Sequence, residues 1–320
     1  MKKYFLFFTI ALLIASCKKE NEVEEKVATV PVSHVKIERF DKLFFESKPQ
    51  DLPKLKRQFP FLFPGDDPNQ VWIDRMKEPF LRQLYSEVQK KYPDVKALEQ
   101  DFESLFKHIK FYYPTFKQPR VITMVNDDET IKAVYKDGIV IVPLSLYLGK
   151  DNEIYKGLAQ YQVQEFEPVL ILPDVVSAFS NGKIAASSDR TLLSAMVYYG
   201  KELYMKDLLL PDMPDHAKIG YTAEQDKWCH ANEADMWTYF VQENLLYDTD
   251  SKLANRFINP APFSKFYLEI DKDSPGRAGQ WMGWQIVRSF AENNKDVTLP
   301  ALLAMDAKEL FDKSKYKPKK

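Results

Sequence analysis

Cysteine and histidine are scarce in this sequence, and their scarcity excludes several kinds of site. Among 320 residues there are two cysteines and four histidines. No His-Glu-x-x-His sequence and no pair of closely spaced cysteines is present, so neither common zinc-binding pattern occurs. A Gly-x-Ser-x-Gly turn and a glycine-rich phosphate loop are also missing. We therefore assign no catalytic residue, and we expect no metal and no other cofactor.

An excess of positive charge is absent too. The chain carries 45 basic and 46 acidic residues, for a formal net charge of −1 at pH 7. Removal of residues 1–16, which contain Lys2 and Lys3, leaves 43 basic residues against 46 acidic ones, or −3. A balance so near neutrality argues against a nucleic-acid binder. Hydrophobic residues make up 45% of the sequence, which predicts a packed core.

The N-terminus has the three parts of a lipoprotein signal peptide. Residues 1–3 are basic, residues 4–14 are mostly apolar, and residues 13–17 read Leu-Ile-Ala-Ser-Cys. This order predicts removal of residues 1–16 and acylation of Cys17, for example by palmitate. Lipid would then hold the protein on a cell-envelope membrane, facing the periplasm, with the choice between inner and outer membrane open. The alternative is an ordinary signal peptide with a chance cysteine.

Composition divides the rest of the chain into three parts. Residues 17–34 are charged, poor in aromatic residues and without periodicity, which predicts a flexible tether. Residues 35–312 are predicted to form a single globular domain, since no linker interrupts them. Residues 313–320 hold five lysines and are predicted to be a solvated basic tail. Cys229 has no disulfide partner once Cys17 is acylated, and its helical pattern predicts a small buried side chain.

Alternating and apolar segments in the first half predict a small sheet. Residues 35–40 alternate as a half-buried strand does, and residues 120–125 read as a second strand. Residues 131–135 and 139–143 flank residues 136–138 (Lys-Asp-Gly), which are typical of a hairpin turn. We expect an antiparallel sheet.

Helical spacing dominates elsewhere and predicts a mainly helical α+β fold. Apolar periodicity, capping signals and prolines predict helices over residues 73–88 with a kink at Pro79, 95–109, 191–210, 222–246, 277–293 and 300–312. Residues 222–225 (Thr-Ala-Glu-Gln) fit a capping box at a helix start. The sheet with its hairpin would precede a large helical part.

His230 and Glu233 are the candidates for a metal site. They stand three residues apart on one predicted helix, so they would share a face. A metal would need at least one more ligand from elsewhere, and two residues alone are a weak signal. The favoured alternative is a polar helix face whose charges are solvated or paired.

A dense segment at residues 273–285 suggests a cleft wall or a partner-docking surface. The candidates for this surface are Trp228, Trp237, Arg277, Trp281 and Trp284. Aromatic residues and arginine are the types enriched where partners bind tightly. Close helix packing in the core is the favoured alternative.

Glycines inside predicted helices indicate close packing. Gly279 and Gly283 are four residues apart and would let another backbone approach. Gly200 interrupts a helix at a cost of about 1 kcal/mol relative to alanine, so it too is interpreted as a packing residue. The neighbouring Lys201 and Glu202 are interpreted as part of a solvated face, with a functional role as the alternative.

Several longer segments resemble one known family, the GldB gliding-motility lipoproteins of the Bacteroidetes. They are the signal through Cys17 and residues 198–204, 219–222, 228–237, 261–266, 274–277 and 279–287. The resemblance spans most of the mature chain. It implies an envelope lipoprotein needed for gliding, which acts beside the gliding motor and the type IX secretion machinery.

The family is in turn distantly similar to zinc metallopeptidases of the gluzincin type. The counterpart of their His-Glu-x-x-His helix would be residues 192–199, which hold neither histidine nor glutamate. Glu233 would be what remains of the downstream glutamate ligand. The resemblance thus implies a metallopeptidase-like fold without zinc chemistry.

Three functions follow as hypotheses. The first is a non-catalytic scaffold or assembly factor, a pseudoenzyme that contacts the membrane through lipid on Cys17 and binds envelope proteins of the gliding and secretion machinery. The second is a lipid-anchored ligand binder that uses an aromatic cleft. The third is a divergent hydrolase or peptidase with a site near His230 and Glu233.

Overall fold

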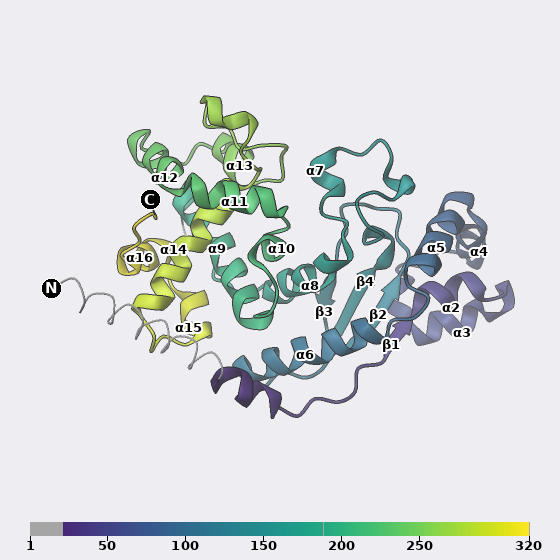
Figure 1. The fold of residues 1–320 in the computed structure, drawn as a ribbon. Coiled ribbons are helices and arrows are strands. Elements are labelled where there is room, and N and C mark those ends of the chain that lie inside the picture. The colour runs from purple at the N-terminus through teal and green to yellow at the C-terminus, as the bar shows by residue number, and fades with distance from the viewer. Residues whose placement is uncertain (1–21, 188, 320) are drawn as a thin grey trace.

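The computed structural model describes residues 22–187 and 189–319 (Figure 1). The predicted signal peptide and Cys17 lie outside these residues. The strands are β1 (Ile37–Arg39), β2 (Arg120–Met124), β3 (Val134–Lys136) and β4 (Ile139–Pro143). The helices of the first half are α2 (Phe40–Glu46), α3 (Leu52–Gln58), α4 (Asn69–Lys77), α5 (Pro79–Lys91), α6 (Lys96–Tyr112), α7 (Gln160–Val163) and α8 (Ile171–Ser180). Those of the second half are α9 (Leu192–Leu209), α10 (Asp215–Ile219), α11 (Ala223–Ala231), α12 (Glu233–Gln242), α13 (Lys252–Phe257), α14 (Ala278–Asn293), α15 (Leu299–Ala304) and α16 (Ala307–Ser314).

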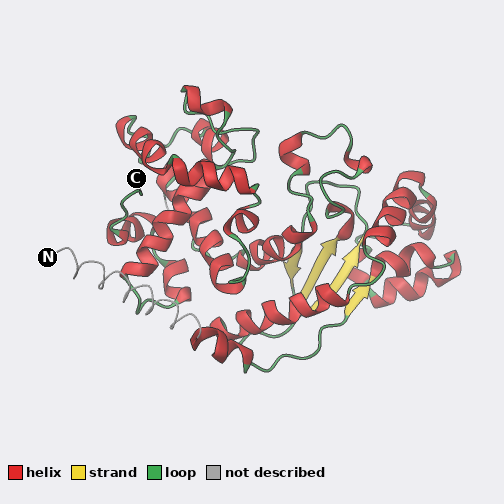
Figure 2. Ribbon diagram, in the orientation of Figure 1, coloured by secondary structure: helices red, strands yellow, loops and turns green. Residues whose placement is uncertain are grey.

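The molecule has a sheet-containing half and an all-helical half. Figure 1 shows the sheet with α2–α5 on one side, α9–α16 on the other, and α8 between them. Figure 2 shows that helices far outnumber strands, so the prediction of a mainly helical fold with a small sheet is confirmed. No helix in the described part of the chain is both long and apolar enough to cross a lipid bilayer.

The sheet is mixed, and the prediction of an antiparallel sheet was wrong. Its strand order is β1-β2-β4-β3. β1 pairs with β2 in parallel, and β2 pairs with β4 in parallel. Only the β3–β4 edge pair within this sheet is antiparallel, and it turns at Asp137 and Gly138, which both have positive φ. The parallel partners are far apart in sequence, so no local pattern could have revealed their direction.

Three of the predicted helices are each divided in two. Pro79 does not kink a long helix but occupies the first position of α5, where its missing N–H leaves no hydrogen bond unmade. The chain breaks again at Asn232, between α11 and α12, and before Asp306, which caps α16. Two residues predicted to begin helices do so. Thr222 and Gln225 form the reciprocal capping box of α11, and the helix expected over residues 191–210 is α9, capped by Thr191.

α9 and α14 cross with their backbones in contact. A Cβ added at Gly283 would lie 1.8 Å from the carbonyl oxygen of Met196, and one added at Gly200 would lie 2.3 Å from the carbonyl oxygen of Gly283. Side chains cannot occupy such distances, so glycine is required on both helices. The packing role predicted for these glycines is confirmed.

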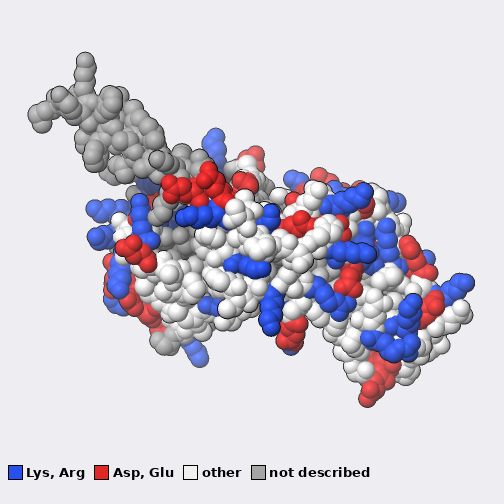
Figure 3. Space-filling model, turned by 90° about the horizontal axis from the view of Figure 1, so that it is seen from below, with Lys and Arg blue, Asp and Glu red and all other residues white. Residues whose placement is uncertain are grey.

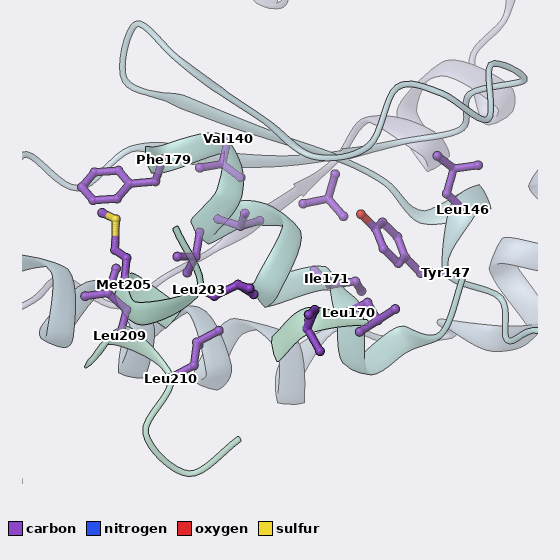
Figure 4. Close-up of a cluster of buried hydrophobic side chains, with 14 of the residues drawn as sticks. Val140, Leu146, Tyr147, Leu170, Ile171, Phe179, Leu203, Met205, Leu209 and Leu210 are labelled. Carbon is purple, nitrogen blue, oxygen red and sulfur yellow. The ribbon is translucent and has the colours of Figure 1, made fainter. Parts of the chain in front are cut away.

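The hydrophobic core runs from the sheet into the helical half. Figure 4 shows one cluster in which side chains from β4, α8 and α9 meet, among them Val140, Ile171 and Leu203. All three are nearly inaccessible to solvent. α8 therefore packs against the sheet on one side and α9 on the other, which ties the two halves together.

Both ends of the domain are docked, contrary to the sequence prediction. Residues 22–28 are helical, and Val27 within them is 2% exposed. Glu24 lies 3.2 Å from Nε2 of His108 on α6. At the other end Ser314 is fully buried, and the Tyr316 hydroxyl donates to Glu233 at 2.7 Å. Both segments are rich in charged residues, so their composition gave no indication of the few side chains that anchor them.

Candidate functional site: a charged cavity

The largest collection of buried charge surrounds a cavity between the two halves. Its volume is about 290 Å³. The loop after β2 contributes Lys132, and the segment after α7 contributes Glu165. α8, α9, α10, residues 258–260 after α13 and the start of α14 complete the wall. On the face seen from below, Figure 3 shows acidic and basic side chains interspersed.

Glu165 bridges two cations in this cavity. Its Oε1 lies 2.9 Å from an Nη2 of Arg277, and its Oε2 accepts a hydrogen bond of 2.6 Å from Nζ of Lys132. Burial acts to raise the pKa of Glu165, but the charges of Arg277 and Lys132 outweigh burial and hold the pKa below its usual value. Glu165 is therefore an ionised partner, not a proton donor.

Asp174 behaves differently from Glu165. Its Oδ2 accepts a hydrogen bond of 2.9 Å from the Tyr147 hydroxyl and lies 3.8 Å from Nζ of Lys132. Burial raises the pKa of Asp174, and the nearby Lys132 and Lys206 only partly offset this effect. The cavity thus contains two carboxyl groups whose environments push their pKa values apart.

α9 provides a further ion pair, and the Ser177 hydroxyl of α8 is hydrogen-bonded to it. Nζ of Lys206 lies 3.5 Å from Glu202 and donates to the carbonyl oxygen of Lys218 at 3.1 Å. The Ser177 hydroxyl donates to Glu202 at 2.6 Å. No histidine lies among the described residues that line the cavity. Ser177 consequently has no neighbouring imidazole to activate it as a nucleophile.

The charges around the cavity balance. Lys218 also lines it, but its ammonium belongs to a separate group behind the wall, with Asp207 at 3.0 Å and Asp215 at 3.5 Å. Arg288 completes that group through paired hydrogen bonds to both aspartates. Without Lys218, three cations and three anions remain on the cavity wall: Lys132, Lys206, Arg277, Glu165, Asp174 and Glu202.

A network of fixed hydrogen bonds positions Arg277. Arg277 precedes α14 in the left-handed conformation, with φ of 62°. The residue before it, Gly276, accepts a hydrogen bond of 2.6 Å from the buried Tyr221 hydroxyl. A Cβ on Gly276 would lie 2.2 Å from the carbonyl oxygen of Ala261. Ser264 closes the loop by donating to the carbonyl oxygen of Pro275. The guanidinium therefore projects from a rigid turn.

The structure separates the residues that the sequence offered as a docking or cleft surface. Arg277 lines the cavity. Trp281 and Trp284 are fully buried, so they present no aromatic face, and the favoured alternative of core packing holds for both. Their indole N–H groups donate inward to Asp226 and Asp207. Trp228 and Trp237 are half-buried and pack against the core.

His230 and Glu233 are not brought together as a metal site. They lie on different helices because the chain breaks at Asn232. His230 stands 3.8 Å from Asp226, whereas Glu233 is 2% exposed and bonded to Tyr316. Over residues 22–187 and 189–319, no group of three or more His, Cys, Asp or Glu side chains is arranged to hold a metal ion.

Two further side chains on helices have defined positions. Cys229 is fully buried, as its sequence position predicted, and burial raises the pKa of its thiol well above the usual value. Lys201 is 2% exposed, so the interpretation of it as part of a solvated face was wrong. Its ammonium donates to the carbonyl oxygens of Leu303 and Met305, between α15 and α16.

A family model described as gliding motility protein GldB matches residues 20–318. The chain belongs to the GldB family. Membership indicates involvement in gliding motility, and the lipoprotein character of the family agrees with a lipid-anchored envelope protein. No curated protein and no solved structure matches the chain. A metallopeptidase-like fold for this GldB-family member accordingly stays a prediction.

Of the six charged residues that balance around the cavity, Arg277 was predicted from the sequence as a site candidate, and Glu202 was interpreted as part of a solvated face, with a functional role as the alternative. The other four are Lys132, Glu165, Asp174 and Lys206. One signal was available. Asp174 and Lys206 stand within strongly apolar helical stretches, where a charged residue needs a partner if it is buried.

Proposed function

We propose that this GldB-family chain is a non-catalytic lipoprotein that docks on envelope proteins and supports assembly of the gliding and type IX secretion machinery. Lipid on Cys17 would hold it at the membrane, on the periplasmic side. The observation that carries the proposal is the contact between α9 and α14. Residues 192–199, where a related peptidase would hold its ligands, are packed so tightly that Met196 meets the backbone of Gly283.

The position of Glu233 supports the same proposal. Its buried carboxylate accepts a hydrogen bond from Tyr316 and so acts in packing the C-terminal tail. A zinc-bound water would need both free ligands and space, and neither accompanies Glu233 among the described residues.

Two substitutions in the full-length chain test this role. Glu233→Gln keeps the shape and can still accept the Tyr316 hydrogen bond, but it removes a metal ligand. We expect normal colony spreading and unchanged crosslinking to envelope partners. Cys17→Ala removes the acylation site, and we expect loss of spreading and of those crosslinks at equal protein level.

Two results would contradict the proposal. One is stoichiometric zinc in the purified protein together with peptide cleavage that Glu233→Gln abolishes. The other is unchanged partner crosslinking in Cys17→Ala. A thermal melt of each variant separates loss of function from loss of folding.

A further inference from the structure

We propose that the charged cavity binds a small zwitterion, a free amino acid or a dipeptide that carries both an ammonium and a carboxylate group. The inference goes beyond the docking role and stands or falls independently of it. It rests on the charges of the cavity wall, on polar groups that have no hydrogen-bond partner among the described residues, and on the size and rigidity of the site.

The charge balance decides the net charge of the ligand. Lys218 on the wall is neutralised by Asp207 and Asp215, and the remaining three cations face three anions whose side chains are mostly buried. A ligand with net charge would leave an uncompensated charge in a poorly solvated site, which costs several kcal/mol. A neutral ligand avoids this cost. A zwitterion is neutral overall yet still forms charge-assisted hydrogen bonds at both ends.

Arg277 offers a place for the carboxylate. Its two described polar contacts, to Glu165 at 2.9 Å and to the carbonyl oxygen of Gly220 at 3.3 Å, both use Nη2. A guanidinium has five N–H donors in a planar fork, and carboxylates match that fork. The Nε and Nη1 donors have no partner among the described contacts. They are therefore available on a side chain that lines the cavity.

Asp174 offers a place for the ammonium group. Its Oδ2 accepts from Tyr147 and faces Lys132, while Oδ1 has no partner among the described hydrogen bonds. Glu202, held by Ser177 and Lys206, adds a second carboxylate on the same wall. An ammonium donates three hydrogen bonds, so it can satisfy oxygens of both groups.

Size and rigidity favour a small ligand. A cavity of about 290 Å³ is at the lower end of ligand pockets. The turn that carries Arg277 is fixed by Tyr221 and Ser264, so little ordering would be needed on binding. Arg277 itself has a left-handed backbone, a conformation unfavourable for residues other than glycine. Such strain recurs where a side chain must be aimed at a ligand.

The binding test uses the full-length acylated protein in detergent. The probes are L-alanine and glycylglycine as zwitterions, N-acetylglycine as an anion, ethanolamine as a cation, and glucose as a neutral sugar. We expect both zwitterions to raise the melting temperature in a saturable way and to bind in equilibrium dialysis. The other three probes should do neither. Saturable binding of a singly charged probe or of glucose in preference to the zwitterions would overturn the proposal, as would no binding of either zwitterion at millimolar concentration.

Matched variants locate the site. Asp174→Asn and Arg277→Gln each remove one charge from the balanced set, and we expect each to weaken zwitterion binding by about tenfold or more. Lys308→Gln, at an exposed ion pair on α16, should bind as the unmodified protein does. Dialysis at a temperature where each variant is folded keeps the comparison valid if one variant melts early. Unchanged binding in both cavity variants would place the ligand elsewhere.

Discussion

The backbones of Gly200 and Gly283 meet where α9 crosses α14, two helices that are distant in sequence. A Cβ on Gly283 would lie within 2.3 Å of two backbone atoms of Met196, which cannot rotate away as a side chain would. α9 and α14 are thus held at a distance that only glycine permits.

Gly283→Ala should therefore strongly destabilise the domain. Overpacking of cores usually costs 1–3 kcal/mol, and because backbone must move here we expect a loss of about 3 kcal/mol or more in the free energy of unfolding. Urea denaturation measures it. Glu292→Ala on the exposed face of the same helix is the control and should change stability by less than about 0.5 kcal/mol. A Gly283→Ala protein as stable as the unmodified one would show that the helices do not cross at these residues.

Tyr316→Phe should release the C-terminal tail. It removes the donor to the buried Glu233 carboxylate, and a hydrogen bond to a charged group contributes about 1.5–3 kcal/mol. Tyr247→Phe, at an exposed ring, is the control and should be neutral. Equal stability of the two variants would mean that the tail is not anchored by this contact.

The same tyrosine makes the stability of the protein decrease at high pH. Burial, followed by the neighbouring Glu233, raises the pKa of Tyr316 above its usual value. A raised pKa means that the folded state keeps the proton up to a higher pH than the unfolded state does. The contribution of protonated Tyr316 to the free energy of unfolding is complete below the unfolded pKa of about 10. It is lost as pH rises beyond that value. The stability difference between the unmodified protein and Tyr316→Phe should shrink from pH 9 upward.

Arg288→Lys tests the ionic group behind the cavity wall. Arg288 makes paired hydrogen bonds to Asp207 and Asp215 and lies 3.8 Å over the ring of Trp284. Lysine keeps the charge but not the planar fork, so we expect a loss of about 3 kcal/mol. Arg75→Lys, at an exposed pair with Asp127, should cost less than about 1 kcal/mol.

The stability that Arg288 provides is lost at low pH, whereas the stability that Tyr316 provides is lost at high pH. Burial acts to raise the pKa of Asp215, but Arg288 outweighs burial and holds the pKa below its usual value. The resulting stability is present above the unfolded pKa of about 4 and is lost as pH falls through the folded pKa. Unfolding measured in urea between pH 7 and pH 3 should show the cost of Arg288→Lys falling. A constant cost would indicate that the ion pairs contribute nothing.

Lys201 provides a prediction in the alkaline range. Burial lowers the pKa of this ammonium to about 8, although Asp306 acts in the opposite direction. Between that value and the unfolded pKa of about 10.4, the unfolded chain binds more protons, so stability rises with pH. Urea denaturation at pH 7 to 10 should show the unmodified protein gaining stability relative to Lys201→Met. The tyrosines are common to both proteins and cancel. A difference that does not change with pH would contradict a buried, titrating Lys201.

Local signals in the sequence predicted local structure well. Thr191 and Thr222 cap the helices that they were expected to start. The turn at residues 136–138 lies between β3 and β4. Each of these depends on residues within four positions of one another, which is the range over which capping and turn chemistry act.

Distant contacts were not predictable in the same way. The direction of the β1–β2 pair is set by where the chain returns after α6, not by any residue in either strand. Lys201 and Lys218 look like ordinary surface charges until their partners are known, yet both are buried. The cavity was missed for the same reason, because Lys132, Glu165 and Arg277 come together only in the folded chain.

The docked N-terminal helix has a mechanical consequence. A chain held by its N-terminus transmits any pulling force first to residues 22–28, which contact α6 through Glu24 and His108. β1, a three-residue strand with hydrogen bonds to Glu99 and Glu103 nearby, comes next in line. Under load these weak attachments should detach in order and lengthen the reach of the protein, while the α9–α14 crossing stays intact.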